Sequence, residues 1–201
     1  MRPHVCPWWG GYFIDNPLRR LLHQPEKILA PFLAPGMTAL DFGCGMGIFA
    51  IAMARLVGPE GKVIAADVQP QMLAALEKRA RKAGLAERIR GHLCQPDRLG
   101  LAEPIDFALA FWSAHEAGDL RRLFEHVCAH LAGGGRFLIV EPRGHVAEHE
   151  FRDMVQSARR VGFDRLDDAP RVRLSHVAAL VKSAPMDRPI DPQGGSSADR
   201  Q

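Results

Sequence analysis

The chain has 201 residues, of which 47% are hydrophobic, and its formal net charge is +3. This length allows one globular domain with a sizeable core, and the charge is too small to require a nucleic-acid partner. No apolar run reaches the roughly 18 residues of a membrane span, and the N-terminus lacks the apolar core of a signal peptide. Four scattered cysteines without a C-x-x-C pair are typical of reduced thiols. We therefore expect a cytoplasmic globular protein that does not bind membranes.

An aromatic segment opens the chain. Two prolines and two glycines within residues 1–16 exclude a long helix there. Four large aromatic side chains in this segment are nevertheless too apolar for an exposed tail: Trp8, Trp9, Tyr12 and Phe13. Asn16-Pro17 is typical of a helix start, and Pro35-Gly36 of a turn. We expect residues 1–36 to form an aromatic lid and a helix, with plain packing of the aromatic side chains as the alternative.

Alternating glycines separate an apolar strand at 39–42 from a helix at 48–56. The pattern D-x-G-x-G-x-G runs through Asp41, Gly43, Gly45 and Gly47. Such a turn places backbone N–H groups at a helix N-terminus, where glycine lets a ligand approach closely. A dinucleotide motif requires glycine where Ile48 stands, so the pattern disfavours NAD. A turn that only packs the helix on the strand is the plainer alternative.

This pattern resembles motif I of the Rossmann-like methyltransferases that use S-adenosylmethionine (SAM). The resemblance implies that the glycine turn, with Cys44, packs on the methionine and ribose portions of SAM. A second apolar strand ends in Asp67, twenty positions after Gly47, the spacing at which such folds bring a carboxylate to a ribose. We expect Asp67 to accept from both ribose hydroxyls, with Val68 beside it. Asp67 as a simple helix cap is the alternative.

Further elements alternate along the rest of the chain. We expect helices at 70–83, after Asp119 and at 148–160. The expected strands lie at 89–93, 104–111 and 136–141, from 162 onward and at 171–182, with a sharp glycine turn at 133–135. Such alternation predicts a mostly parallel sheet with helices on both faces. One face of the 70–83 helix carries Lys78, Arg79, Arg81 and Lys82. This face is either solvated or a nucleic-acid patch.

The resemblance implies a definite fold. It is a three-layer α/β Rossmann-like methyltransferase fold whose seven-stranded sheet has the order 3-2-1-4-5-7-6, with strand seven antiparallel. Residues 37–182 would form the SAM-binding domain. Residues 183–201 are rich in Pro, Gly, Ser and Asp, which predicts a disordered tail.

Ligands of such sheets bind beyond the carboxyl ends of the strands, so residues there are site candidates. The resemblance implies adenine contacts near Gln95, where relatives often carry Gly-Asp-Ala, and a cofactor contact at Phe111. The candidate substrate contacts are Trp8, Trp9, Tyr12, Trp112 and Glu141. His115 and Glu116 are candidate catalytic residues, because histidine exchanges a proton near neutral pH. No metal is expected, since the histidine pairs at 126/130 and 145/149 lack further ligands.

These features favour a SAM-dependent methyltransferase that acts on a small molecule. An Asn-Pro-Pro-Tyr tetrad, typical of enzymes that methylate base amines, is absent after the 104–111 strand. A SAM-binding protein without turnover and an RNA methyltransferase are the alternatives. Arsenic methylation is a further alternative because of Cys6 and Cys94, but a pair of cysteines is too common to favour it. A homodimer stays open.

Overall fold

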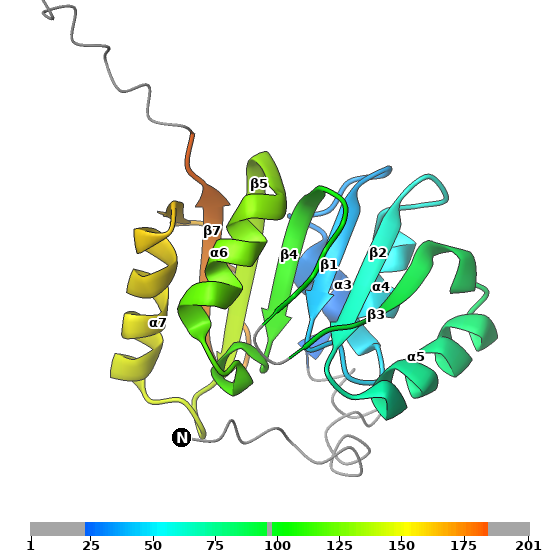
Figure 1. Cartoon of the computed structure of the whole chain (residues 1–201), viewed down its shortest axis with the longest axis horizontal. Coiled ribbons are helices and arrows are strands. Elements are labelled where there is room, and N and C mark those ends of the chain that lie inside the picture. Colours follow the sequence, from blue (N-terminus) through cyan, green and yellow to red (C-terminus); the bar gives the residue numbers. More distant parts are fainter. Residues whose placement is uncertain (1–22, 96–97, 185–201) are drawn as a thin grey trace, which may run out of the picture.

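The computed structural model describes residues 23–95 and 98–184. Its seven-stranded sheet has the order β3-β2-β1-β4-β5-β7-β6 (Figure 1). The strands are β1 (Thr38–Phe42), β2 (Lys62–Asp67), β3 (Ile89–Leu93), β4 (Ile105–Phe111), β5 (Leu131–Pro142), β6 (Phe163–Leu166) and β7 (Ser175–Lys182). Strands β1 to β5 pair in parallel, whereas β7 runs antiparallel to both β5 and β6. The predicted fold class and strand order are confirmed.

Helices cover both faces of this sheet. They are α3 (Pro25–Leu29), α4 (Ile48–Leu56), α5 (Pro70–Lys82), α6 (Leu120–His130) and α7 (Glu148–Arg160), with short 3-10 helices η1 (Ala86–Arg88) and η2 (Ala114–Glu116). Successive side chains of a strand point to opposite faces, so Leu40 joins the core beneath α6 and α7, and Ala39 joins the core beneath α3 and α4. Both residues are fully buried, as expected for a central parallel strand.

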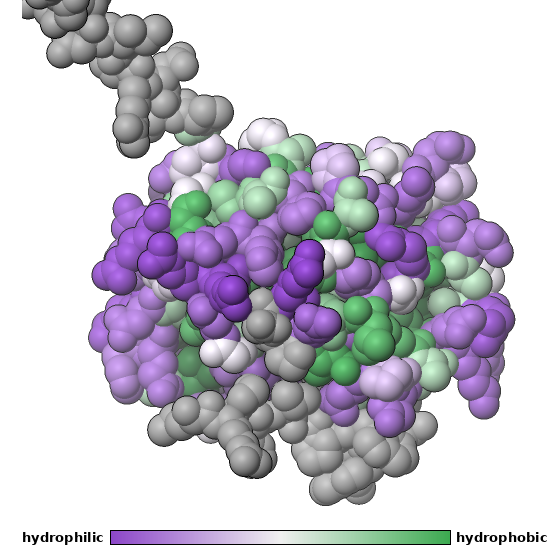
Figure 2. All heavy atoms as spheres, viewed as in Figure 1, coloured by the Kyte–Doolittle hydropathy of each residue, from purple (hydrophilic) through white to green (hydrophobic). Residues whose placement is uncertain are grey.

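Local sequence signals explain where the helices start. The Asp119 carboxylate accepts from the Arg122 N–H at 3.0 Å and caps α6, and α5 begins at Pro70. Helix α7 is amphipathic, because Phe151, Met154 and their neighbours face the core. Its outer surface, on the left of Figure 2, is hydrophilic. No helix within 23–95 and 98–184 is long and apolar enough to cross a membrane.

Two strand boundaries differ from those predicted. Strand β5 begins at Leu131, not after the glycines, because Leu131 already pairs with Ile105 before the register shifts to Arg136 opposite Phe107. The glycines form an irregularity inside this strand, where Gly134 has a φ of +74°. Strand β7 begins only at Ser175, because Leu174 before it has a φ of +57° and breaks the extended conformation.

Candidate functional site

The three glycines of the turn between β1 and α4 all have positive φ, between +52° and +88°. A Cβ built on Gly43 would lie 2.4 Å from the Ser113 Cβ, and one on Gly47 would lie 2.0 Å from Leu76 Cδ1. A Cβ on Gly45 would meet no described atom within 4 Å. Packing on Ser113 therefore already requires glycine at 43, and the Leu76 side chain would have to move for a Cβ at 47, whereas no described residue fills the space beside Gly45.

The Asp67 carboxylate links this turn to the end of β2 through hydrogen bonds. Its Oδ2 accepts from the Gly45 N–H at 3.0 Å, and its Oδ1 accepts from the Gln69 N–H at 2.9 Å. Burial raises the pKa of Asp67, and the N–H groups of Gln69, Gly45 and Val68 oppose that shift. A carboxylate has about four lone-pair sites, so these three N–H groups do not use all of them. The remaining site can accept from a hydroxyl group of a ligand, such as one of a ribose.

Two cysteines at this end of the sheet are buried. Burial, then the charges of Asp41 and Asp67, raises the pKa of the Cys44 thiol well above its ordinary value. Burial, then Asp67, raises the pKa of Cys94 to about 11. Both thiols are therefore protonated at neutral pH, which argues against thiolate chemistry here. Asp41 itself is 2% exposed at the end of β1.

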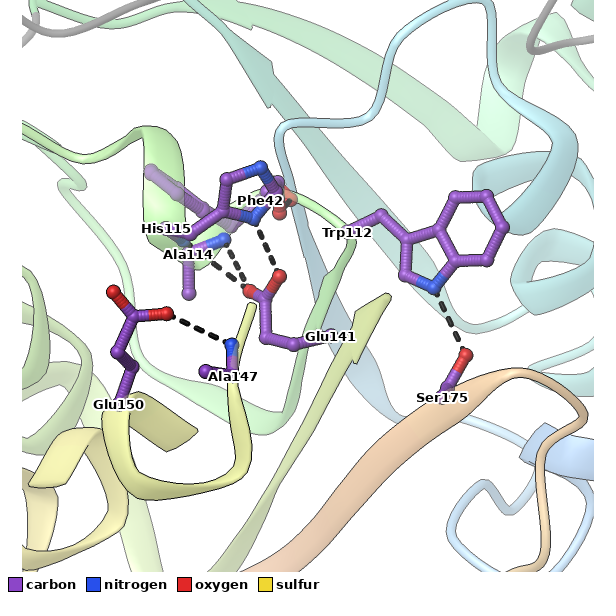
Figure 3. A network of polar contacts seen from close by, with 9 residues as sticks. Phe42, Trp112, Ala114, His115, Glu141, Ala147, Glu150 and Ser175 are labelled. Carbon is purple, nitrogen blue, oxygen red and sulfur yellow. Dashed lines mark hydrogen bonds and ion pairs between the residues drawn. The ribbon is translucent and has the colours of Figure 1, made fainter. Parts of the chain in front are cut away.

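A second polar cluster lies where β4 and β5 end (Figure 3). Glu141 is fully buried, and its Oε1 accepts from the N–H groups of Ala114 at 2.9 Å and His115 at 3.3 Å. Its Oε2 lies 2.5 Å from Nδ1 of His115. The prediction placed Glu141 against the substrate, but its carboxylate faces the 3-10 helix that carries His115. Its contacts are those of a residue that orients another side chain.

Burial lowers the pKa of His115, but the hydrogen bond and charge of Glu141, with the charge of Glu116, outweigh it and raise the pKa above 6.5. The ring of His145 meets the His115 ring edge-on, with centroids 4.9 Å apart. Glu116 is half-buried on the same 3-10 helix. His115, His145, Glu116 and Glu141 thus form a cluster in which negative charge lies beside the His115 ring.

Trp112 directly follows β4 and has a strained backbone, with a φ of +60°. Its indole N–H donates to Ser175 Oγ at 3.0 Å (Figure 3). Its backbone N–H donates to the Val140 carbonyl at 2.7 Å. Its ring lies edge-on to that of His23, 5.0 Å away. His23 is 4% exposed and was missed by the sequence reasoning, because a single histidine carries no signal.

The other predicted residues take varied positions. Phe111 is 5% exposed and stacks on Phe49 at 4.1 Å, which is a core position beneath the turn. Gln95 is exposed and pairs through its backbone with Arg98. Trp8, Trp9 and Tyr12 lie outside the described residues, so the lid stays a prediction.

Two histidines of α6, His126 and His130, contact the backbone of the segment between β3 and β4. The Leu99 N–H lies 3.4 Å from His126 Nδ1, and His130 Nε2 lies 3.0 Å from the Leu101 carbonyl. Within the described part of the chain, no group of three His, Cys, Asp or Glu residues could hold a metal ion.

Comparisons with known proteins agree with this geometry. The sequence pattern of a family described as methyltransferase domain matches residues 33–169. A ribosomal protein L11 methyltransferase from Aliivibrio salmonicida is 35% identical over 100 residues, which are 50% of this chain and 32% of that protein. An arsenite methyltransferase from Halobacterium salinarum is 32% identical over 108 residues, 53% of this chain and 27% of that protein. The matches thus span a third or less of these relatives.

Among solved structures, a SAM-dependent methyltransferase from Aquifex aeolicus superposes with a TM-score of 0.80. The superposition covers 89% of this chain and 100% of that chain at 21% sequence identity, so it shows the shared fold. The chain therefore belongs to the methyltransferase domain family, which confirms the predicted class and, with it, SAM as the cofactor.

Proposed function

We propose that this protein transfers a methyl group from SAM to a small-molecule acceptor. One observation carries the proposal. The glycine turn bonded to Asp67 and the histidine bonded to Glu141 both lie at the carboxyl ends of the strands, on the same side of the domain. When bound, SAM supplies an activated methyl group, so the protein's task is to hold the acceptor in line with it. Gly45 and Asp67 would hold the cofactor, and Trp112 and His115 would face the acceptor.

The basic surface of α5 gives little support to an RNA acceptor. Arg79 donates to the Met46 carbonyl at 3.2 Å, and Arg81 pairs with Glu77 at 2.6 Å. Farther along, Arg88 donates to the Ala54 carbonyl at 3.3 Å, and Arg90 pairs with Glu103. These cations already hold the domain together or neutralise acids. A phosphate backbone needs several cations that are available at once.

A macromolecular acceptor is the second candidate, because one relative is named for ribosomal protein L11. A SAM-binding role without turnover is the third. The acceptor classes differ in size, so fractionated cell material separates them.

The test has two steps. Calorimetry should show that SAM and S-adenosylhomocysteine bind, whereas NAD does not. The protein is then incubated with SAM and either a small-molecule extract or a ribosome and RNA fraction, and S-adenosylhomocysteine release is measured. Release with the small-molecule extract supports the proposal. Release with the macromolecular fraction alone contradicts the small acceptor, and NAD binding tighter than SAM contradicts the cofactor assignment.

A further inference from the structure

The Glu141–His115 pair narrows the class of acceptor. We propose that His115 is a general base that takes the proton of an acceptor hydroxyl, and that Glu141 is the positioning residue that sets the tautomer of His115. This inference rests on the proposed methyl transfer and adds to it the acceptor atom, oxygen. It follows from three features of the pair: its hydrogen bonds, its exposure and the charges around it.

The hydrogen bonds determine which ring nitrogen carries the proton. All three contacts to Glu141 come from nitrogen atoms: the backbone N of Ala114, the backbone N of His115 and Nδ1 of His115. A carboxylate accepts and does not donate. Nδ1 therefore carries the proton, and in the neutral ring the lone pair lies on Nε2.

The exposure of the ring leaves that lone pair available. The His115 side chain is 17% exposed, whereas Glu141 is fully buried. In Figure 3 the second ring nitrogen of His115 lies on the side of the ring away from the carboxylate. Nε2 makes no hydrogen bond to any residue within 23–95 and 98–184. An acceptor at the carboxyl ends of β4 and β5 could thus reach Nε2.

The charges around the ring stabilise the product of proton transfer. Burial disfavours the imidazolium, but Glu141 and Glu116 outweigh burial and raise the pKa of His115. Among the residues that the structure describes, the titratable groups that face the ring are Glu141 from β5, Glu116 from the same 3-10 helix, and His145 after β5. A raised pKa makes the neutral ring a stronger base.

Proton removal matters most for a hydroxyl acceptor. A neutral amine or an arsenite attacks through an existing lone pair, and a thiol with a pKa of about 8.5 ionises readily, whereas a phenol with a pKa of about 10 stays protonated at neutral pH. In the proposed step the hydroxyl proton moves to Nε2 as the oxygen–methyl bond forms and the methyl–sulfur bond breaks. The positive charge of the sulfonium ends on the imidazolium beside Glu141, and the products are a methyl ether and neutral S-adenosylhomocysteine.

A pair of phenols tests the base. With SAM at pH 7, His115→Ala should lower kcat about 100-fold or more for 4-methoxyphenol, the usual contribution of a general base. The loss should be under about tenfold for 4-nitrophenol, because roughly half of that acceptor is already ionised at pH 7. His149→Ala, which alters an exposed histidine on α7, should keep both rates. Equal losses for the two phenols, or no methylation of either, would overturn the proposal.

The outcomes separate this inference from the proposed function. If S-adenosylhomocysteine forms with anilines or thiophenols and with no phenol, methyl transfer stands and the hydroxyl acceptor is wrong. If the protein does not bind SAM, the proposed function itself fails.

A second variant tests Glu141 without relying on turnover. In Glu141→Gln the amide NH₂ would face Nδ1 and reverse the tautomer, placing the proton on Nε2. Nitrogen-15 NMR of the protein without SAM should show that reversal and a lower pKa of His115. With 4-methoxyphenol, kcat should fall about 100-fold, and the acid limb of the pH profile should move to lower pH.

Glu150→Gln is the matched control, because the exposed Glu150 only caps α7 by accepting from the Ala147 N–H at 2.8 Å. It should leave the tautomer and the pH profile unchanged. An unchanged tautomer in a folded Glu141→Gln protein would refute the positioning role.

Discussion

Replacing Gly43 by alanine should destabilise the protein strongly, because Ser113 already occupies the space for a side chain. The new Cβ would lie 2.4 Å from the Ser113 Cβ, at a residue whose φ is +65°. A left-handed backbone costs a non-glycine residue roughly 1–2 kcal/mol, and overpacking costs about 1–3 kcal/mol. We therefore expect a loss of about 2–5 kcal/mol in the free energy of unfolding, measured by urea denaturation.

Gly45→Ala is the matched control for backbone strain. Its φ of +52° is similar, but its Cβ would meet no described atom within 4 Å. Its cost should be only the roughly 1–2 kcal/mol of backbone strain. If Gly43→Ala is no more destabilising than Gly45→Ala, the packing argument fails.

A double-mutant cycle isolates the contact with Ser113. Ser113→Gly alone removes the hydrogen bond to the Phe42 carbonyl, which is 2.7 Å long and worth about 0.5–1.5 kcal/mol. It also removes the atom that would clash with a Cβ at Gly43. The double variant should therefore cost about 1–3 kcal/mol less than the sum of the single variants. Strict additivity would refute the reasoning.

Three further predictions test the rest of the site. Asp67→Asn should weaken SAM binding at least about tenfold, because hydrogen bonds to a charged acceptor are worth about 1.5–3 kcal/mol each. The fold should persist, since the raised pKa of Asp67 means that its buried charge is unfavourable. Calorimetry measures the dissociation constant of SAM, with Asp164→Asn at an exposed position as the control. An unchanged dissociation constant for Asp67→Asn would contradict the ribose role. Trp112→Phe should cost about 0.5–1.5 kcal/mol in urea denaturation, because it removes the indole bond to Ser175, and an unchanged midpoint would contradict that. The pKa of His115 is raised in the folded protein, so its pairing with Glu141 stabilises the fold below pH 6.5 and that contribution is lost as the pH rises through the folded pKa. The difference in the free energy of unfolding between the unmodified protein and Glu141→Gln should therefore shrink as the pH rises through the folded pKa. A difference that does not depend on pH would contradict the pairing.

The sequence predicted those parts of the fold that depend on local patterns. Asp41, the three glycines and Asp67 are placed by strand ends and by a fixed spacing, which are visible along the chain. The start of β5 was mispredicted, because a glycine run reads as a turn although its pairing partner, β4, holds it inside a strand. Local patterns cannot show which distant strand accommodates such an irregularity.

The pairings between distant segments could not be predicted either. Ser113 and Gly43 are far apart along the chain, so the packing reason for that glycine is invisible in the motif itself. His115 and Glu141 were both predicted as site residues, but with separate roles. Only the parallel pairing of β4 with β5 brings their side chains together.

The segment that follows β4 connects the two halves of the candidate site, which are the glycine turn and the His115–Glu141 pair. Its Trp112 N–H is bonded to the Val140 carbonyl, its Ser113 hydroxyl to the Phe42 carbonyl and its Ala114 N–H to Glu141. It is therefore anchored to the ends of both β1 and β5, the strands on either side of β4. The glycine turn packs directly on Ser113, two residues before His115. Methyl transfer requires the acceptor to be aligned with the methyl group, and a misplacement of about 1 Å can cost about 100-fold in rate. A connection of this kind would position His115, the proposed base, relative to the glycine turn, the proposed cofactor site, without a further structural element between them.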